Sequence, residues 1–214
     1  MVALHPTTLR IRRGEFVAII GPSGSGKSTL LGLMGGLVAP TAGRIWVGDL
    51  DLSALDLART AELRRRSVGY VFQELNLIDG LSAVENVTLP LELDGMRFST
   101  ASELAMKALS RVGIDHLSDR RPDQMSGGER QRTAIARAMV GDRSILLTDE
   151  PTGSLDTATG ENVVDLLVEF CRFGGCCVMV THDLSLARRA DRTLRLSDGQ
   201  LQEANSGSRQ GNDS

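Results

Sequence analysis

The feature that most constrains this chain is the glycine-rich stretch GPSGSGKST at 21–29, which follows the apolar run FVAII. It satisfies the pattern G-x-x-x-x-G-K-[ST], with the fixed positions taken by Gly21, Gly26, Lys27 and Ser28. When a strand enters such a loop and a helix leaves it, backbone N–H groups at the helix N-terminus face phosphate oxygens. We therefore predict a strand before this stretch, a phosphate-binding loop, and a helix over 27–37.

Every residue of the loop is a candidate phosphate contact, namely Gly21, Pro22, Ser23, Gly24, Ser25, Gly26, Lys27, Ser28 and Thr29. In this motif the lysine, here Lys27, reaches the β- and γ-phosphate oxygens of a nucleoside triphosphate. The hydroxyl that follows it, here on Ser28, binds Mg²⁺. The loop alone thus predicts a nucleotide and a metal ion as ligands.

A second element of such a site is ILLTDEP at 145–151, an apolar strand that ends in two carboxylates. Asp149 is a candidate Mg²⁺ ligand through the water shell of the ion, and Glu150 is a candidate base for an attacking water. Adjacent side chains of a strand point to opposite sides, which would let the two carboxylates address different partners. The alternative is an ordinary turn, because Asp-Glu-Pro is also good turn chemistry.

The chain alternates between strand-like and helix-like segments, which indicates an α/β fold with a mainly parallel sheet covered on both faces. Strands are expected at 16–20, 44–47, 67–72, 145–148 and 178–181, and helices at 82–93, 100–112, 128–139 and 160–172. Ser82 and Glu85 form a candidate capping box. We predict a single domain over 1–214, with a core at 1–73 and 141–203, a helical subdomain at 74–140, and a polar, disordered tail at 204–214.

Composition narrows the class of partner. The net charge of −3 is nearly balanced and aromatic residues make up 3%, which argues against a nucleic-acid binder. Arginine clusters at 64–66, 120–121 and 188–189 are separate and offset by acids, and this favours solvated faces over a nucleic-acid patch. No apolar run approaches the roughly 20 residues that cross a bilayer, and no basic-then-apolar leader is present. We therefore expect a cytosolic chain that reaches a membrane only through a partner.

The cysteines and two of the histidines carry no recognisable pattern. Cys171, Cys176 and Cys177 lack metal-ligand spacing and are interpreted as reduced structural thiols, with a redox role as the unsupported alternative. His5 and His116 lie in expected loops and are given no role.

The stretch MSGGERQR at 125–132 narrows the family. Ser126 can cap a helix, while Gly127 and Gly128 let its backbone approach an anion; alone, this also describes an ordinary capped helix. Beside the phosphate loop it resembles the ABC transporter signature LSGGQ, with Met125 for Leu and Glu129 for Gln. The resemblance covers nearly the whole chain. It implies a P-loop NTPase (RecA-like) parallel-sheet core with an N-terminal antiparallel β portion and an inserted α-helical subdomain.

The same resemblance implies roles for further residues. Gln73, after VGYVF, is similar to the Q-loop glutamine that contacts Mg²⁺ and the helical subdomain. The SLD at 154–156 is similar to the D-loop, with Asp156 at a subunit contact, and His182 resembles the switch histidine that contacts the γ-phosphate. The family forms an ATP sandwich, a homodimer in which ATP lies between Lys27 of one chain and Ser126 of the other. ATP hydrolysis with Mg²⁺ is the implied reaction.

Within the family, GLMGGLVAPTAGRI, VGYVFQELNLIDGLSAVENVTLPLEL and DEPTGSLDTATGENVVDLL are most similar to the LolD, MacB and FtsE types. These imply an ATPase subunit on the inner face of a bacterial membrane, driving export or mechanical transmission through an FtsX- or MacB-like permease. The segment 75–93 would line the groove that receives the permease. One alternative is an FtsE-type regulator of an extracytoplasmic enzyme. Another is a soluble ATPase acting on ribosomes or DNA, although no second cassette or coiled coil is present.

One departure concerns the nucleotide base. The family usually carries an aromatic residue, upstream of the P-loop lysine, that stacks on adenine. Here that place falls near Met1 and Val2, and neither is aromatic. The departure implies either a short N-terminus or weak stacking, and weak stacking would give comparable affinities for ATP and GTP.

Overall fold

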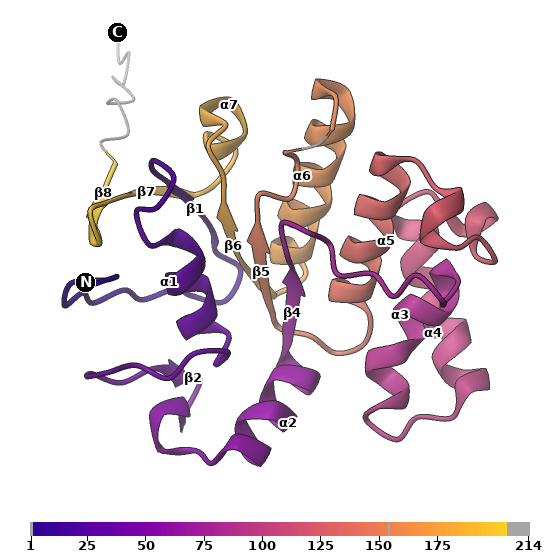
Figure 1. Ribbon diagram of the computed structural model, residues 1–214, viewed down its shortest axis with the longest axis horizontal. Coiled ribbons are helices and arrows are strands. Elements are labelled where there is room, and N and C mark those ends of the chain that lie inside the picture. Colours follow the sequence, from indigo (N-terminus) through magenta and orange to yellow (C-terminus); the bar gives the residue numbers. More distant parts are fainter. Residues whose placement is uncertain (1, 154, 205–214) are drawn as a thin grey trace, which may run out of the picture.

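A mainly parallel sheet forms the core of the computed structural model, which describes residues 2–153 and 155–204. Within these residues the sheet has six strands in the order β4-β5-β6-β1-β7-β8 (Figure 1). The strands are β1 (Phe16–Ile20), β4 (Val68–Val71), β5 (Ile145–Asp149), β6 (Cys176–Val180), β7 (Arg192–Ser197) and β8 (Gln200–Glu203). All neighbours are parallel except β7 and β8. The predicted α/β fold class is therefore confirmed.

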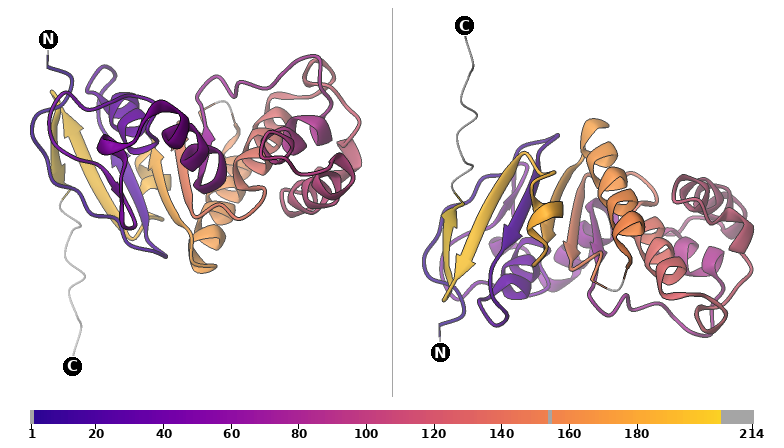
Figure 2. Two further views of the ribbon diagram at one scale, coloured as in Figure 1. Left: turned by 90° about the horizontal axis from the view of Figure 1, so that it is seen from below. Right: turned by 90° about the horizontal axis from the view of Figure 1, so that it is seen from above.

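Helices cover both faces of the sheet (Figure 2). Helices α1 (Lys27–Met34) and α2 (Leu57–Ser67) pack on one face. Helices α6 (Thr157–Arg172) and α7 (Leu184–Ala187) pack on the other. Residues of β1 alternate between the two apolar clusters that result: Val17 and Ile19 face the α1 side, whereas Phe16 and Ala18 face the α6 side. This two-sided burial explains why the strand reads as a continuous apolar run.

Parallel strands bring their carboxyl ends to one edge of the sheet, where ligands bind in open α/β folds. The segments that follow β1, β4, β5 and β6 therefore meet there, although they are far apart in the sequence. These segments are the phosphate loop, the Gln73 loop, and the residues after Asp149 and Val180. The topology thus assembles one site from four stretches.

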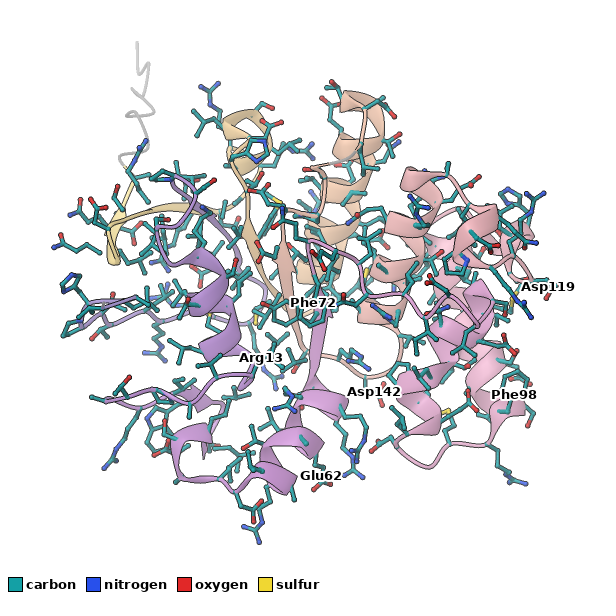
Figure 3. All side chains as sticks on the ribbon, in the orientation of Figure 1. Arg13, Glu62, Phe72, Phe98, Asp119 and Asp142 are labelled. Carbon is teal, nitrogen blue, oxygen red and sulfur yellow. The ribbon has the colours of Figure 1, made fainter. Side chains whose placement is uncertain are left out.

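The helical subdomain consists of α3 (Ala83–Glu92), α4 (Phe98–Arg111) and α5 (Gly127–Met139), with short 3₁₀ turns η2 (Asp115–Leu117) and η3 (Pro122–Gln124). The predicted capping box is present: Ser82 N donates to Glu85 Oε2 at 2.7 Å, and Glu85 N donates to Ser82 Oγ at 3.4 Å. Phe98 and Asp119 mark the outer side of the subdomain in Figure 3. The subdomain lies beside the β4 edge of the sheet, against which α5 packs.

A small antiparallel sheet pairs β2 (Trp46–Val47) with β3 (Leu50–Asp51), followed by the 3₁₀ turn η1 (Leu52–Ala54). This pair confirms the N-terminal antiparallel β portion that the family resemblance implied. The sequence analysis did not locate β3, α2 or the antiparallel β7–β8 pair. Helix α2 is strongly polar and buries only Leu63, so it lacks an apolar periodicity.

The predicted disordered tail lies, from residue 205 onward, outside the described residues. In the described ranges, no helix combines the length and apolar character needed to span a bilayer.

The cysteines cluster where α6 meets the sheet, and all are free thiols. Cys177 is fully buried on β6, and Cys171 Sγ donates to the carbonyl oxygen of Glu15 at 3.6 Å. Burial raises the pKa of the neighbouring Cys176 thiol to about 11. This thiol is therefore protonated at neutral pH, in line with the structural role predicted for it.

Candidate functional site

A cavity of about 520 Å³ lies at the carboxyl edge of the parallel strands. Its lining comes from the end of β5, the first turn of α1 and the loops after β1, β4, β5 and β6. The lining residues are Ser23, Gly24, Lys27, Ser28, Gln73, Asp149, Glu150, Gly153 and His182. Eight of these nine were singled out from the sequence; Gly153 was not. The fold therefore brings residues from four distant stretches, between Ser23 and His182, into a single polar cavity.

The phosphate loop needs glycine at two positions for steric reasons. A Cβ at Gly21 would lie 2.0 Å from the Leu196 carbonyl oxygen. Gly26 has a φ of 103°, and a Cβ there would lie 2.5 Å from the Ala3 carbonyl oxygen. Close packing against β7 and the N-terminal segment thus leaves room for backbone only.

The chemistry of this loop suits an anion. Gly26 caps α1 without a side-chain hydrogen bond, so the first N–H groups of the helix are free to bind a ligand. Lys27 Nζ donates to the carbonyl oxygens of Gly21 at 2.9 Å and Pro22 at 2.8 Å, which keeps the ammonium inside the loop. The buried hydroxyl of Ser25 has no partner within the described residues. Thr29 lies in the first turn of α1 and does not line the cavity.

Asp149 and Glu150 both line the cavity, but not for the reason given by the sequence analysis. Strand β5 ends at Asp149, and Glu150 adopts a left-handed φ of 49°. The two side chains are separated by this backbone turn and not by strand alternation, so the predicted alternation was wrong. Glu150 N still donates to the Val180 carbonyl oxygen at 3.0 Å, which anchors the turn to β6. A non-glycine residue in this conformation is uncommon and often marks a functional site.

Glu150 contacts His182 directly. His182 Nδ1 lies 2.9 Å from Glu150 Oε2, and the backbone N–H of His182 approaches the same oxygen at 3.4 Å. The Glu150 side chain is 14% exposed, whereas that of His182 is 74% exposed. A carboxylate accepts from an imidazole N–H, so this contact forms when His182 carries a proton on Nδ1 and Glu150 is ionised. The carboxylate is consequently shielded and oriented by an imidazole that is open to the cavity.

The MSGGERQR stretch lies away from the cavity, at the start of α5. Ser126 is the N-cap: its N–H donates to Glu129 Oε2 at 2.7 Å, and its Oγ accepts from Glu129 N at 3.3 Å. A Cβ at Gly127 would meet open space, and one at Gly128 would contact Leu155 and Thr159 of the next loop and helix. Within one chain, this helix start does not reach the cavity residues.

Asp156 is the N-cap of α6. Its Oδ1 accepts from Thr159 N at 3.0 Å and its Oδ2 from the Thr159 hydroxyl at 2.7 Å. These hydrogen bonds, above all the one from the Thr159 hydroxyl, lower the pKa of Asp156. Ser154, which precedes it in the SLD stretch, lies outside the described residues. In the single chain Asp156 therefore shapes the loop next to the signature helix and does not line the cavity.

The family model for ABC transporters matches residues 4–153. The chain belongs to the ABC transporter family. The lipoprotein-releasing system ATP-binding protein LolD of Xanthomonas oryzae pv. oryzae is 46% identical over 196 residues, covering 91% of the chain and 80% of LolD. The macrolide export ATP-binding/permease protein MacB of Rhodospirillum rubrum is 45% identical over 201 residues, 94% of the chain. The cassette spans only 31% of that MacB.

Solved structures agree with this membership. A dimeric ATP-binding cassette in a post-hydrolysis state, bound to ADP and Pi, is 39% identical and superimposes with a TM-score of 0.88 over 94% of this chain and 90% of the other. A dimeric bacterial ABC transporter cassette gives the same TM-score at 40% identity and the same coverage. The cassette therefore has both the family membership and the fold of an ABC transporter cassette.

Two features of this ABC cassette escaped the sequence analysis. Gly153 joins the cavity because the turn after Glu150 folds back on itself, with Gly153 N donating to the Glu150 carbonyl oxygen at 3.2 Å. The contact between Glu150 and His182 joins two strand ends that are adjacent only because β5 pairs with β6. The Gly153 turn is local to residues 150–153. No local pattern signals the Glu150–His182 contact, since it depends on strand order.

Proposed function

We propose that Lys27, Glu150 and His182 carry out ATP hydrolysis in this cavity and that the cassette uses it to drive an integral membrane permease. The observation that carries the proposal is the 2.9 Å contact between Glu150 and His182 on the wall of the cavity that also holds Lys27. A shielded carboxylate beside a lysine and a helix N-terminus is the arrangement that hydrolysis of a triphosphate requires.

The phosphate loop binds the triphosphate. Its N–H groups and the start of α1 supply donors, and Lys27 exchanges the carbonyl oxygens of Gly21 and Pro22 for phosphate oxygens when the nucleotide enters. This exchange requires little reorganisation, because the ammonium already lies in the loop. Charge on the transferred phosphoryl group is then stabilised by Lys27 and His182.

The donor set of the cavity fits Mg²⁺. Ser28, Gln73 and Asp149 bring a hydroxyl, an amide oxygen and a carboxylate to the same cavity, and Mg²⁺ prefers oxygen ligands. Mg²⁺ usually takes its remaining ligands from phosphate oxygens and water. When bound, the ion would neutralise charge on the phosphate oxygens.

Glu150 is the group that orients and polarises the attacking water. Its carboxylate is shielded from bulk solvent, and the Nδ1–H of His182 holds one oxygen, leaving the other to accept a proton from water. His182 therefore has two tasks in the proposal, orientation of the base and contact with the terminal phosphate. Both follow from its position at the end of β6.

The second half of the site comes from another copy of the chain. Ser126, Gly127 and Gly128 form a capped helix start with open space around Gly127, and they do not reach the cavity of their own chain. A helix start of this kind binds phosphate well. The solved relatives are dimers. A head-to-tail homodimer would place this helix start over the partner's nucleotide, with Asp156 at the contact.

The membrane partner is proposed from the relatives. LolD is named for a lipoprotein-releasing system, and MacB for combined ATP-binding and permease parts, of which this cassette matches 31%. A separate permease of the FtsX or MacB kind would therefore recruit the cassette to the inner face of the membrane. The segment 75–93, which begins two residues after Gln73 of the cavity, would form its docking groove.

Purification of the tagged cassette in mild detergent from its native host tests the partner. Recovery of an integral permease, retained through washing and lost when 75–93 carries charge-reversing substitutions, supports the proposal. Recovery of ribosomes or DNA without a permease would overturn it. Light scattering on Glu150→Gln with ATP tests the dimer, which should double the mass of the nucleotide-free monomer.

A further inference from the structure

The loop after Gln73 holds an unusual backbone. Leu75 and Asn76 have φ values of 59° and 47°, two consecutive non-glycine residues in the left-handed region. Asparagine tolerates this region, but leucine rarely adopts it. Inside the loop, Leu75 N donates to the Phe72 carbonyl oxygen at 3.0 Å and Asn76 N to that of Glu74 at 2.6 Å. Interactions from outside must therefore hold the loop in this form.

Arg137 of α5 supplies such an interaction. Its Nη2 donates to the Leu75 carbonyl oxygen and its Nη1 to the Asn76 carbonyl oxygen, both at 2.6 Å. A planar guanidinium can hold two neighbouring oxygens at once, which a lysine ammonium cannot do with the same geometry. Over residues 2–153 and 155–204 no carboxylate forms an ion pair with Arg137, and burial lowers its pKa. Both terminal nitrogens of the Arg137 guanidinium therefore bond to the two residues with left-handed backbone.

The far end of the loop is held by Asn86 of α3, whose side chain is fully buried. Ile78 N donates to Asn86 Oδ1 at 2.8 Å, and Asn86 Nδ2 lies 3.1 Å from the Ile78 carbonyl oxygen and 3.0 Å from that of Leu81. Both ends of the loop are thus hydrogen-bonded to the helical subdomain. Gln73, at the start of the loop, lines the cavity formed by the core.

Helix α5 connects two parts of the site. Its N-terminus is capped by Ser126, and Arg137 lies in its last turn. At about 1.5 Å of rise per residue, Arg137 is roughly 15 Å from the helix start along a rigid rod. A displacement of α5 must therefore move the carbonyl groups of Leu75 and Asn76, and with them Gln73 two residues away.

We propose that Arg137 is a positioning residue that sets the place of Gln73 in the cavity. It also transmits movement of α5 to Gln73. The inference rests on the proposed function, in which the amide oxygen of Gln73 is a ligand for Mg²⁺. The Arg137 guanidinium donates charge-assisted hydrogen bonds to two backbone carbonyl groups. These bonds fix a strained loop, and Arg137 itself does not contact the nucleotide.

Arg143 offers a matched control. It is also half-buried and also donates to backbone carbonyl oxygens, to Val140 from Nε at 3.0 Å and to Val68 from Nη1 at 2.5 Å. Burial lowers its pKa to about 10. Its targets lie at the end of α5 and the start of β4, outside the Gln73 loop. Substituting it removes the same type of interaction and leaves the loop carbonyl groups bonded.

Amide hydrogen exchange of the nucleotide-free cassette tests whether Arg137 stabilises the Gln73 loop. Arg137→Ala should speed exchange in peptides covering 73–78 by about tenfold or more, with Arg137→Lys intermediate and Arg143→Ala unchanged in that segment. Unchanged exchange at 73–78 in Arg137→Ala would overturn the proposal. Should Arg137→Ala fail to fold, Arg137→Lys gives the same comparison against Arg143→Lys.

A double-mutant cycle on hydrolysis tests whether Arg137 acts through Gln73. Arg137→Ala should lower kcat by about tenfold to a hundredfold, an effect typical of a small misplacement in an active site. The same change in the Gln73→Ala background should have no further effect. Independent, multiplicative losses would overturn the positioning role. A Gln73→Ala cassette with full turnover would instead overturn the proposed role of Gln73, and with it the catalytic part of this inference.

Discussion

His182 Nδ1 and Glu150 Oε2 lie 2.9 Å apart, although one residue follows β6 and the other follows β5. The contact exists because the two strands are hydrogen-bonded neighbours, with Asp149 opposite Val180. Glu150 then turns into the left-handed region while His182 continues beyond its strand, and the two side chains meet over the cavity. Sheet pairing thereby fixes the contact between the proposed base, Glu150, and the residue proposed to orient it, His182.

Glu150→Gln should retain ATP binding and lose turnover by about a hundredfold to ten-thousandfold, since an amide cannot accept the proton of the attacking water. The measurements are steady-state phosphate release and equilibrium nucleotide binding. Glu161→Gln, an exposed glutamate on α6, is the control and should leave both unchanged. Full turnover by Glu150→Gln would remove Glu150 as the base.

His182→Ala should lower kcat by about tenfold to a hundredfold and change the KM for ATP little, because the phosphate loop is untouched while Glu150 loses its orienting partner. Steady-state kinetics over a range of ATP concentrations separate the two parameters. His116→Ala, in the exposed turn η2, is the matched histidine control. A rise in KM at constant kcat would contradict the orienting role.

Lys27→Ala should weaken nucleotide binding and turnover together, each by about tenfold or more, because a charge-assisted hydrogen bond to phosphate is lost. Binding of a fluorescent ATP analogue and phosphate release are the readouts. The exposed Lys107 on α4 is the other lysine of the chain, and Lys107→Ala controls for the loss of one positive charge. Unaltered ATP affinity in Lys27→Ala would conflict with the predicted loop contact.

The Ser82–Glu85 capping box predicts a pH dependence of stability. Hydrogen bonds from the backbone N–H and the hydroxyl of Ser82 lower the pKa of Glu85 from its ordinary value of 4.5. A carboxyl group whose pKa is lowered by folding stabilises the fold above its ordinary pKa and loses that effect as pH falls through the folded pKa. The box is fully formed at pH 7 and weakens in acid.

Glu85→Gln should therefore reduce the free energy of unfolding at pH 7, and the difference from wild type should shrink below the ordinary pKa of the carboxyl group. Urea denaturation at neutral and acidic pH measures this difference. Glu103→Gln, an exposed glutamate on α4, should show no such pH-dependent difference. A difference that grows toward acid would reverse the sign and refute the argument.

Elements with a strong local signal could be predicted from the sequence. The apolar run FVAII predicted the strand, and the glycine spacing predicted the loop and the start of α1. The predicted end of α1 was wrong, since the helix ends at Met34 and not at 37. The capping box at Ser82 and the N-cap at Ser126 follow from the same logic, whereas the return hydrogen bond to Glu129 was not predicted. Helix α2 carried no such signal, because it buries a single leucine among charged residues.

The sequence by itself determined the chemistry of the cassette: a phosphate loop, a strand ending in carboxylates and a glycine-rich helix start, each defined by neighbours in the chain. Only the tertiary structure decided how these parts meet. The order β4-β5-β6-β1 brings Gln73, Glu150 and His182 to Lys27, and Arg137 reaches the Gln73 loop across 61 residues of chain. Local propensity acts over a few residues, whereas strand order and side-chain contacts between distant segments are set by burial of the whole core.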